Sequence, residues 1–329
     1  MSLQTIEEIA AFIVADGKGI LAADESNPTC GKRFDSIGVA STEENRRDYR
    51  EMLFRSAGMQ ENIGGVILFD ETIKQEAADG TLLRDIISAQ GALPGIKVDK
   101  GLEPIEDCPG ETVTVGLDGL NARLQDYAAM GAKFTKWRAV INIGAGIPTD
   151  KCIDLNMQAL ADYAKLAQDN GMVPIVEPEV LMDGDHSIDD CYAVTERSLK
   201  SLFLHLEKNG VNIQGTLLKP NMVTSGKDCA EQASVEEVAH KTLECLTSNV
   251  PEQHCFNFSC LARPKGAHAT TLEQFVEKNQ RLVRRRKNAT PLNNTRLDPP
   301  DEQVDPLRSQ MQRDQDTLLP RLTSLHPLP

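Results

Sequence analysis

Apolar and β-branched runs alternate with amphipathic stretches of helical spacing over the first 250 residues of the chain. This order is typical of parallel strands that are joined by crossover helices. It predicts six β/α units, whose strands cover residues 19–24, 65–69, 95–99, 134–141, 173–179 and 215–221.

Capping residues mark the helices between these strands. Ser41-Thr-Glu-Glu44 and Ser234-Val-Glu-Glu237 each place a serine three positions before a glutamate, which predicts a capping box at a helix start. Gly171 and Gly210 predict the ends of two further helices, because glycine readily adopts the backbone conformation that closes a helix.

Charged side chains recur at or near the carboxyl ends of four predicted strands. Three pairs keep the two-residue spacing that puts both side chains on one strand face: Lys97 with Asp99, Lys136 with Arg138, and Glu177 with Glu179. A single pair is as typical of a solvated strand end, or of an ion-pair network without a catalytic role, as it is of a functional site. Charges on the same face of successive parallel strands converge, so their recurrence favours a functional site.

The predicted fold is therefore α/β, a TIM (β/α)8-type barrel, whose catalytic site lies at the carboxyl rim of the strands. Six β/α units are recognisable, and the last two strands are replaced or missing. An open doubly wound sheet is the alternative architecture. No G-x-G-x-x-G pattern follows the first strand and no Walker-type loop is present, which disfavours a nucleotide-binding sheet.

Composition narrows the class of protein. The 329 residues allow one large domain or two smaller ones, and no apolar stretch reaches the ~20 residues of a membrane span. The first residues lack a basic region and a signal-peptide core, so we expect a cytoplasmic protein. A formal net charge of −14 argues against a nucleic-acid partner.

Cysteine and histidine placement predicts neither disulfides nor a metal. The 8 cysteines contain no C-x-x-C pair, and buried reduced thiols are expected in a chain of this size. The 6 histidines form no ligand motif, and only His186 has acidic neighbours. We predict no cofactor and no metal site.

The composition changes near Pro251. Residues 1–250 hold 23 Lys+Arg against 40 Asp+Glu, while residues 251–329 hold 12 against 9. Nine of the 17 prolines lie in this last segment, but of the 23 glycines only Gly266 does. Its basic run, residues 281–287, is more typical of a solvated helix end or arm than of a nucleic-acid or membrane patch.

Lys219 is the candidate nucleophile, because it lies in the apolar run 215–223, where an ammonium is costly unless it is paired, deprotonated or reactive. Burial and a nearby cation such as Lys136 or Arg138 would favour its neutral, nucleophilic form. Forming a Schiff base also needs a proton shuttle, which Glu177 can supply if its environment raises its pKa. Asp24, at the tip of the first strand, can take a proton from a substrate hydroxyl in a retro-aldol step.

Five segments resemble class I fructose-bisphosphate aldolase, in the family's order: Ile20 to Ser26, Gly95 to Gly101, Ala132 to Arg138, Pro174 to Glu179, and Gly215 to Val223. The resemblance extends to about residue 250. It implies a β/α barrel, a homotetramer, and metal-independent cleavage of fructose 1,6-bisphosphate, a phosphorylated ketose, to dihydroxyacetone phosphate and glyceraldehyde 3-phosphate in glycolysis and gluconeogenesis.

The resemblance also implies roles for individual residues. Lys219 matches the Schiff-base lysine and Glu177 the main proton shuttle, while Asp24, Lys136 and Glu179 match residues that assist carbon-carbon cleavage and proton transfer. Five positions match substrate-binding or phosphate-side residues: Ser26, Arg33, Arg46, Lys97 and Arg138.

Residues 251–329 depart from the family pattern, which expects a Ser-Gly-Gly loop after a seventh strand, a Ser-Tyr-Gly-Arg segment after an eighth, and a terminal tyrosine. Cys255 to Ala262 is the segment there that can act as a strand, and Leu272 to Val283 can form a helix. We predict an aldolase-like barrel portion over residues 1–250 and a divergent, irregular or partly disordered segment over 251–329. A shifted reading frame, a retained intron or an alternative exon would explain the change.

Three functional hypotheses follow. The leading one is a fructose-bisphosphate aldolase. The first alternative is a catalytically impaired truncation, splice or frameshift product that acts at most as a binding protein. The second is another Schiff-base lyase with a different phosphorylated or keto-acid substrate. A zinc-dependent aldolase is disfavoured, because the histidines that it requires are missing.

Overall fold

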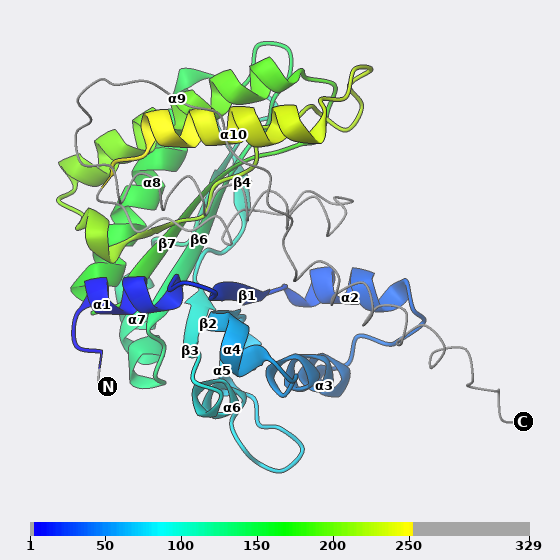
Figure 1. The fold of residues 1–329 in the computed structure, drawn as a ribbon, viewed down its shortest axis with the longest axis vertical. Coiled ribbons are helices and arrows are strands. Elements are labelled where there is room, and N and C mark those ends of the chain that lie inside the picture. The colour runs from blue at the N-terminus through cyan, green and yellow to red at the C-terminus, as the bar shows by residue number, and fades with distance from the viewer. Residues whose placement is uncertain (1–2, 253–329) are drawn as a thin grey trace, which may run out of the picture. The chain divides into compact units, whose positions relative to one another are not determined.

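The computed structural model describes residues 3–252, whose central element is a six-stranded parallel sheet (Figure 1). The strands follow the order β1-β2-β3-β6-β7-β8. Their bounds are β1 Gly19–Ala23, β2 Ile63–Leu68, β3 Leu93–Lys97, β6 Phe134–Ile141, β7 Val173–Val180 and β8 Leu217–Leu218. All six predicted strands are therefore confirmed, although β8 is shorter than expected.

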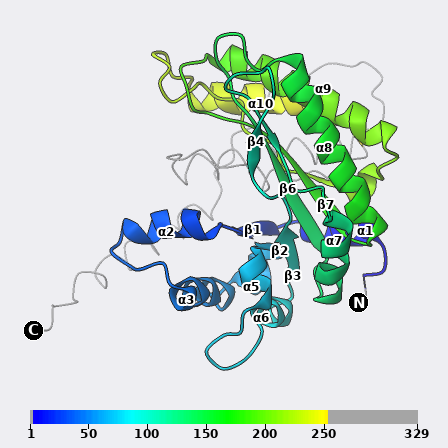
Figure 2. The ribbon, with the colours of Figure 1, turned by 180° about the vertical axis from the view of Figure 1, so that it is seen from behind.

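The sheet is curled. In Figures 1 and 2, β1 lies across the view while β6 and β7 run steeply along it. Adjacent strands in this order pair in parallel, and among the described residues β1 and β8 form the two edges. This is the arrangement of the first six units of a β/α barrel, in which parallel strands tilt and coil around a common axis.

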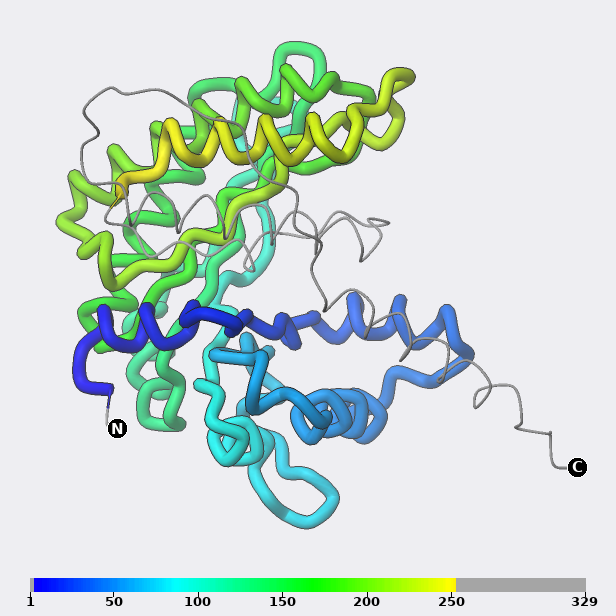
Figure 3. Tube along the Cα trace, viewed as in Figure 1, coloured from blue at the N-terminus to red at the C-terminus, as the bar shows by residue number. Residues whose placement is uncertain are grey.

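Apart from α1, which precedes β1, the helices follow the strands on the outside of the curl, as the tube in Figure 3 also traces. Their bounds are α1 Ile6–Ile13, α2 Asn27–Asp35, α3 Glu43–Phe54, α4 Met59–Asn62, α5 Asp70–Lys74, α6 Leu83–Ala89, α7 Leu120–Ala129, α8 Asp150–Asp169, α9 Ile188–Lys208, η1 Ile213–Gly215 and α10 Val235–Asn249. α8 packs against β6, β7 and α9, and α9 packs against α10.

The predicted helix signals are mostly confirmed. Ser234 caps α10 through a bond from the Glu237 backbone N–H, which is one of the two bonds of the predicted capping box. Gly171 and Gly210 adopt positive φ just after α8 and α9. The first capping prediction is off by one residue. Thr42, not Ser41, caps α3, because its hydroxyl accepts from the Asn45 N–H at 3.1 Å.

A two-stranded antiparallel ribbon was not predicted. It joins β4 Leu102–Pro104 to β5 Thr112–Thr114 in the connection between β3 and α7. Three-residue strands are too short to show the alternation of apolar and polar residues from which a hairpin is predicted. The ribbon lies next to the carboxyl end of β3, so it contributes to the rim of the curl.

Two apolar clusters hold the sheet. The larger fills the space between the sheet and the outer helices and includes Trp137, which stacks on Tyr163 at a ring separation of 5.5 Å. The smaller lies inside the curl, where Ile9 and Ile13 of α1 meet Phe134, Ile175 and Leu217. α1 therefore covers the amino-terminal end of the strands.

Close backbone approach explains three glycines of this inner region. A Cβ at Gly64 would lie 2.3 Å from the Ile13 carbonyl oxygen, and one at Gly215 would lie 2.4 Å from the Ile6 side chain. A Cβ at Gly95 would lie 2.3 Å from the Phe134 ring. A larger residue would displace the Ile13 backbone at Gly64, the Ile6 side chain at Gly215 and the Phe134 ring at Gly95.

Two further predictions concern the chain's class and extent. Within residues 3–252 no helix is both long and apolar enough to cross a membrane. The cysteines of this part are free, and five of the six are buried. The predictions for residues 251–329, including the strand at Cys255 to Ala262 and the helix at Leu272 to Val283, lie outside the described residues except at their first two positions.

Candidate active site

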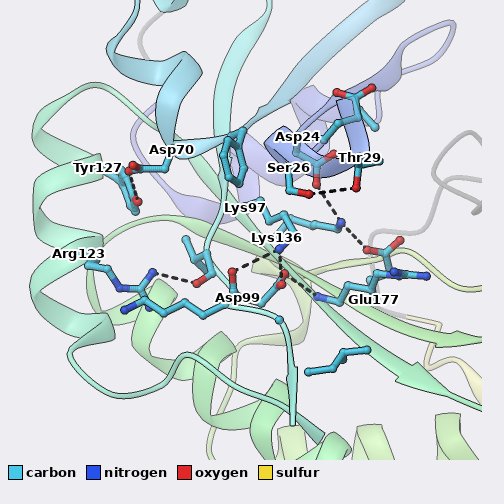
Figure 4. A pocket seen from close by; sticks show the side chains of 18 of the residues that line it. Asp24, Ser26, Thr29, Asp70, Lys97, Asp99, Arg123, Tyr127, Lys136 and Glu177 are labelled. Carbon is cyan, nitrogen blue, oxygen red and sulfur yellow. Dashed lines mark hydrogen bonds and ion pairs between the residues drawn. The ribbon is translucent and has the colours of Figure 1, made fainter. Parts of the chain in front are cut away.

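A pocket of about 1060 Å³ opens at the carboxyl ends of the strands, where charged side chains from five strands and their following loops meet (Figure 4). Eight predicted site residues line it: Asp24, Ser26, Arg33, Lys97, Lys136, Arg138, Glu177 and Glu179. Lys219 is not a lining residue itself but contacts one, Glu177. Parallel pairing explains the convergence, because the carboxyl ends of all these strands lie on the same side of the sheet.

Four charged groups form a continuous chain, called here the charged quartet: Asp24, Lys136, Glu177 and Lys219. The Lys136 Nζ lies 3.0 Å from the Asp24 Oδ2 and 2.8 Å from the Glu177 Oε2. The Lys219 Nζ contacts the other carboxylate oxygen of Glu177. Lys219 itself follows β8, and its backbone N–H donates to the Val176 carbonyl at 2.9 Å, so the strand pairing fixes its position opposite Glu177.

Lys136 and Glu177 are the buried members of the quartet, and the charges around them shift the pKa of both. Burial alone would raise the pKa of Glu177, but the ammonium groups of Lys136 and Lys219 outweigh it and lower that pKa to about 2. Burial alone would lower the pKa of Lys136, yet Glu177 and Asp24 raise it above the usual lysine value. The environment therefore lowers the Glu177 pKa, opposite to the direction that the sequence reasoning required, and Glu177 is an ionised carboxylate at neutral pH.

Two more cations of the pocket each bind a carboxylate. The Arg138 Nε donates to Glu179, and burial, which by itself lowers the Arg138 pKa, is outweighed by Glu179 and Glu177, which raise it. The Lys97 Nζ donates to the carboxylate of Asp99. An anionic ligand would therefore meet cations that are already held in place by internal counter-ions.

The start of α2 forms a further wall. The Ser26 and Thr29 hydroxyls lie 3.0 Å apart and both residues line the pocket. Arg33 lies one turn further along α2, is largely exposed, and is bound by Glu25. Hydroxyls and a guanidinium on the first turns of a helix are groups that suit a phosphate.

Arg46 is not among the residues that line this pocket. Its guanidinium binds Glu71 with two bonds, at 2.9 and 2.7 Å, and Glu71 also accepts from the Asn27 side chain at 3.0 Å. This carboxylate raises the Arg46 pKa. The structure thus places Arg46 behind the wall, where it fixes the start of α2 through Asn27.

Sequence reasoning missed several residues of the pocket. Asp99 was seen as the partner of Lys97 on one strand face but was not selected, and Glu25 stands between two selected residues. The Tyr127 hydroxyl donates to Asp70 at 2.7 Å on the opposite wall, and both line the pocket (Figure 4). These two come from α7 and α5, so no spacing in the sequence brings them together.

Metal ligation has no evident place in the described part of the chain. Residues 3–252 contain no group of three His, Cys, Asp or Glu side chains that could hold a metal ion. His186 is buried beside Asp185 and Asp190, and burial lowers its pKa. The chemistry that the pocket offers is that of amines and carboxylates.

The chain is similar to known proteins over the same region. The family model for class-I fructose-bisphosphate aldolase matches residues 5–255. A probable fructose-bisphosphate aldolase class 1 of Xanthomonas campestris pv. campestris is 55% identical over 251 residues, which are 76% of this chain and 75% of that one.

A plant relative and a solved structure extend this likeness. The cytosolic fructose-bisphosphate aldolase 4 of Arabidopsis thaliana is 49% identical over 251 residues, 76% of this chain and 64% of that one. The structure of the fructose-bisphosphate aldolase from Plasmodium falciparum matches with a TM-score of 0.74 and 44% identity, over 75% of this chain and 72% of that one.

Proposed function

The chain belongs to the class I fructose-bisphosphate aldolase family, and from this premise we propose that it cleaves fructose 1,6-bisphosphate reversibly through a Schiff base on Lys219. The products are dihydroxyacetone phosphate and glyceraldehyde 3-phosphate, and the reaction belongs to glycolysis and gluconeogenesis. The single observation that carries the proposal is the charged quartet, which sets a lysine amine directly against an ionised carboxylate at the carboxyl rim of the strands.

The first step is the formation of the Schiff base. The Glu177 carboxylate takes a proton from the Lys219 ammonium that it contacts, and the neutral amine attacks the substrate ketone. A second proton passes from the attacking nitrogen to the former ketone oxygen, which gives the carbinolamine hydroxyl. This hydroxyl takes the first proton back from Glu177 and leaves as water. The iminium that forms carries the positive charge formerly on Lys219, so the total charge of the pocket is unchanged and Glu177 is again a carboxylate.

Carbon-carbon cleavage follows at the other end of the quartet. We assign to Asp24 the removal of the proton from the substrate hydroxyl, and the bond electrons flow into the iminium to give an enamine. Lys136, 3.0 Å from the Asp24 Oδ2, stabilises the negative charge that the hydroxyl oxygen develops. Glu179 holds Arg138 in the adjoining wall and completes the set.

Phosphate recognition falls to the remaining predicted residues. Ser26, Arg33, Lys97 and Arg138 line the pocket with hydroxyl, ammonium and guanidinium donors, which are the groups that bind phosphate oxygens. Arg46 is proposed to support this wall indirectly, through Glu71 and Asn27.

Other properties are carried over from the family. We propose a homotetramer, because the resemblance implies one, and a cytoplasmic location, because the relative from Arabidopsis thaliana is named as cytosolic. We also propose residues 1–250 as the catalytic portion, since the family match covers residues 5–255. The relatives that are 49–55% identical are all named as aldolases, which supports catalysis over a binding-only product.

The test is a cleavage assay on the purified full chain beside Lys219→Met, with borohydride trapping of dihydroxyacetone phosphate. We expect cleavage by the natural chain and a covalent adduct on Lys219, with neither in the variant. Glu207→Gln, an exposed change on α9 at a residue that does not line the pocket, serves as the control. A folded chain that forms no adduct and cleaves no faster than Lys219→Met contradicts the proposal.

A further inference from the structure

Asp99 is a buried carboxylate of the pocket that the proposed reaction does not use. It follows β3 by two residues, and its side chain is 5% exposed. A carboxylate in such a place is costly unless its oxygens are bonded, so its partners indicate why the chain keeps it.

Both oxygens of the Asp99 carboxylate are engaged by neighbours at the pocket wall. One accepts from the Lys97 ammonium, and the other lies 3.4 Å from the backbone N–H of Arg138. The Lys97 Nζ also lies 3.3 Å from the Asp99 carbonyl oxygen. Asp99 therefore ties the side chain of one pocket cation to the backbone of another.

The backbone between Lys97 and Asp99 is fixed as well. The Val98 N–H donates to the Lys136 carbonyl at 3.0 Å, and the Val98 carbonyl accepts from the Arg123 guanidinium at 2.9 Å. The residue before Asp99 is thus bonded to both β6 and α7, and the Asp99 side chain is bonded through both of its oxygens. Figure 4 shows Lys97, Asp99, Lys136 and Arg123 around the same side of the pocket.

A lysine side chain loses much rotamer freedom when it is fixed in one place. If an internal carboxylate fixes it before the ligand arrives, the ligand does not bear that cost, which is how preorganisation increases affinity. Lys97 is 20% exposed and lines the pocket, so its ammonium remains within reach of a ligand while Asp99 holds it.

We propose that Asp99 is a positioning residue for substrate affinity, which holds the Lys97 ammonium against the pocket wall so that a phosphate group of the ketose phosphate meets a preplaced cation. This inference rests on the proposed function, because Lys97 was assigned there to phosphate recognition. It makes no demand on the Schiff-base steps, in which Asp99 takes no part.

Asp99 could instead compete with the substrate phosphate for the Lys97 ammonium. If Asp99 only neutralised Lys97 and competed with the phosphate, removing its charge would free the ammonium and tighten binding. The two roles therefore predict changes in opposite directions for Asp99→Asn, a substitution that keeps the size of the side chain.

The experiment measures binding of a hexitol 1,6-bisphosphate, a substrate analogue without a ketone, by calorimetry at fixed ionic strength. The full chain is compared with Asp99→Asn, Lys97→Met and the double variant, and Trp137 fluorescence verifies that each is folded. Glu103→Gln, an exposed carboxylate in β4, gives the same charge change as a control. We expect Asp99→Asn to weaken binding about tenfold, Lys97→Met at least as much, the double variant no more than Lys97→Met, and the control to bind as the natural chain does.

A parallel cleavage assay separates affinity from chemistry. We expect Asp99→Asn to raise KM by a similar factor while kcat stays within about twofold, because the quartet keeps its contacts. Unchanged or tighter binding by Asp99→Asn, additive effects of the two single variants, or no binding of the analogue by the natural chain each overturn the inference. Binding without cleavage by the natural chain instead contradicts the proposed function and leaves the binding comparison decisive for Asp99.

Discussion

Replacing Lys136 by methionine removes the ammonium that contacts both Asp24 and Glu177 in the charged quartet. Methionine keeps an unbranched stem of similar length, so the main change is electrostatic. The Lys136 side chain is 8% exposed and that of Glu177 is 3% exposed. Breaking a buried ion pair by removing one partner costs about 3–5 kcal/mol, because the charge that remains has lost its counter-ion.

The pKa of Glu177 gives a second route to the magnitude. That pKa is about 2 in the folded chain, against an ordinary value of 4.5. A difference of about 2.5 in pKa corresponds to about 3 kcal/mol of folding free energy at neutral pH. Because the folded-state pKa is the lower one, this stabilisation is complete above about pH 4.5 and is lost as the pH falls through about 2.

The variant loses most of this contribution, because Lys136 is the stronger of the two cations that hold the Glu177 pKa down. We therefore expect Lys136→Met to lower the free energy of unfolding by about 3 kcal/mol at pH 7 and by about half as much at pH 3. The stability difference between the variant and the natural chain should therefore become smaller as the pH falls. A loss of packing alone would give a difference that does not depend on pH.

The assay is urea unfolding at pH 7 and pH 3, monitored by the fluorescence of Trp137. Trp137 is the chain's single tryptophan and is fully buried in β6. Lys133→Met, the same substitution at an exposed position, is the matched control and is expected to change stability by less than about 0.5 kcal/mol. A difference between Lys136→Met and the natural chain that stays constant from pH 7 to pH 3, or that is below about 1 kcal/mol at pH 7, would refute the reasoning.

Two further substitutions test the packing around the site. Gly95→Ala places a Cβ 2.3 Å from the Phe134 ring and should lower the free energy of unfolding, measured in urea, by about 1–3 kcal/mol. Gly31→Ala in α2 is the control, because its added atom meets only ordinary contacts at 3.6 Å, and it should be neutral or stabilising. Equal losses of stability at the two glycines would contradict this expectation. Arg50→Met removes a fully buried guanidinium that donates to the Ala23 and Glu25 carbonyls, and it should cost about 3–5 kcal/mol, so a melting temperature equal to that of the natural chain would show that this group contributes nothing.

The sequence predicts the strands and their order well, because a parallel strand that is buried on both faces consists mainly of apolar residues. All six strands lie at such apolar runs. It also predicts that charges at spacing two converge, and the pocket brings Lys136, Arg138, Glu177 and Glu179 together. What spacing cannot give is which atom contacts which. Two ammonium groups contact the two oxygens of Glu177, and these contacts decide that its pKa is lowered rather than raised. The contacts depend on the tilt of β6, β7 and β8.

Buried charges on helices are the other gap. Arg46 and Arg50 are four residues apart on α3, and a helical pattern places such residues on a solvated face. Both are buried instead, because Glu71 and Glu25 lie opposite them. The pairing joins residues on α5 and after β1 to α3, and no local rule in the sequence indicates it. Arg46 was for this reason assigned to the substrate rather than to Glu71.

The position of α1 has a consequence for how the chain is made. α1 begins at Ile6, but Gly215, against which Ile6 lies, and Asn212, which donates to Glu7 at 2.5 Å, are synthesised roughly 200 residues later. At about 5–20 residues per second, this interval is on the order of ten seconds or more. α1 also packs against β2 and β7, which are made earlier, so its apolar face is covered in stages and is fully covered only when η1 and the last described strand have been made.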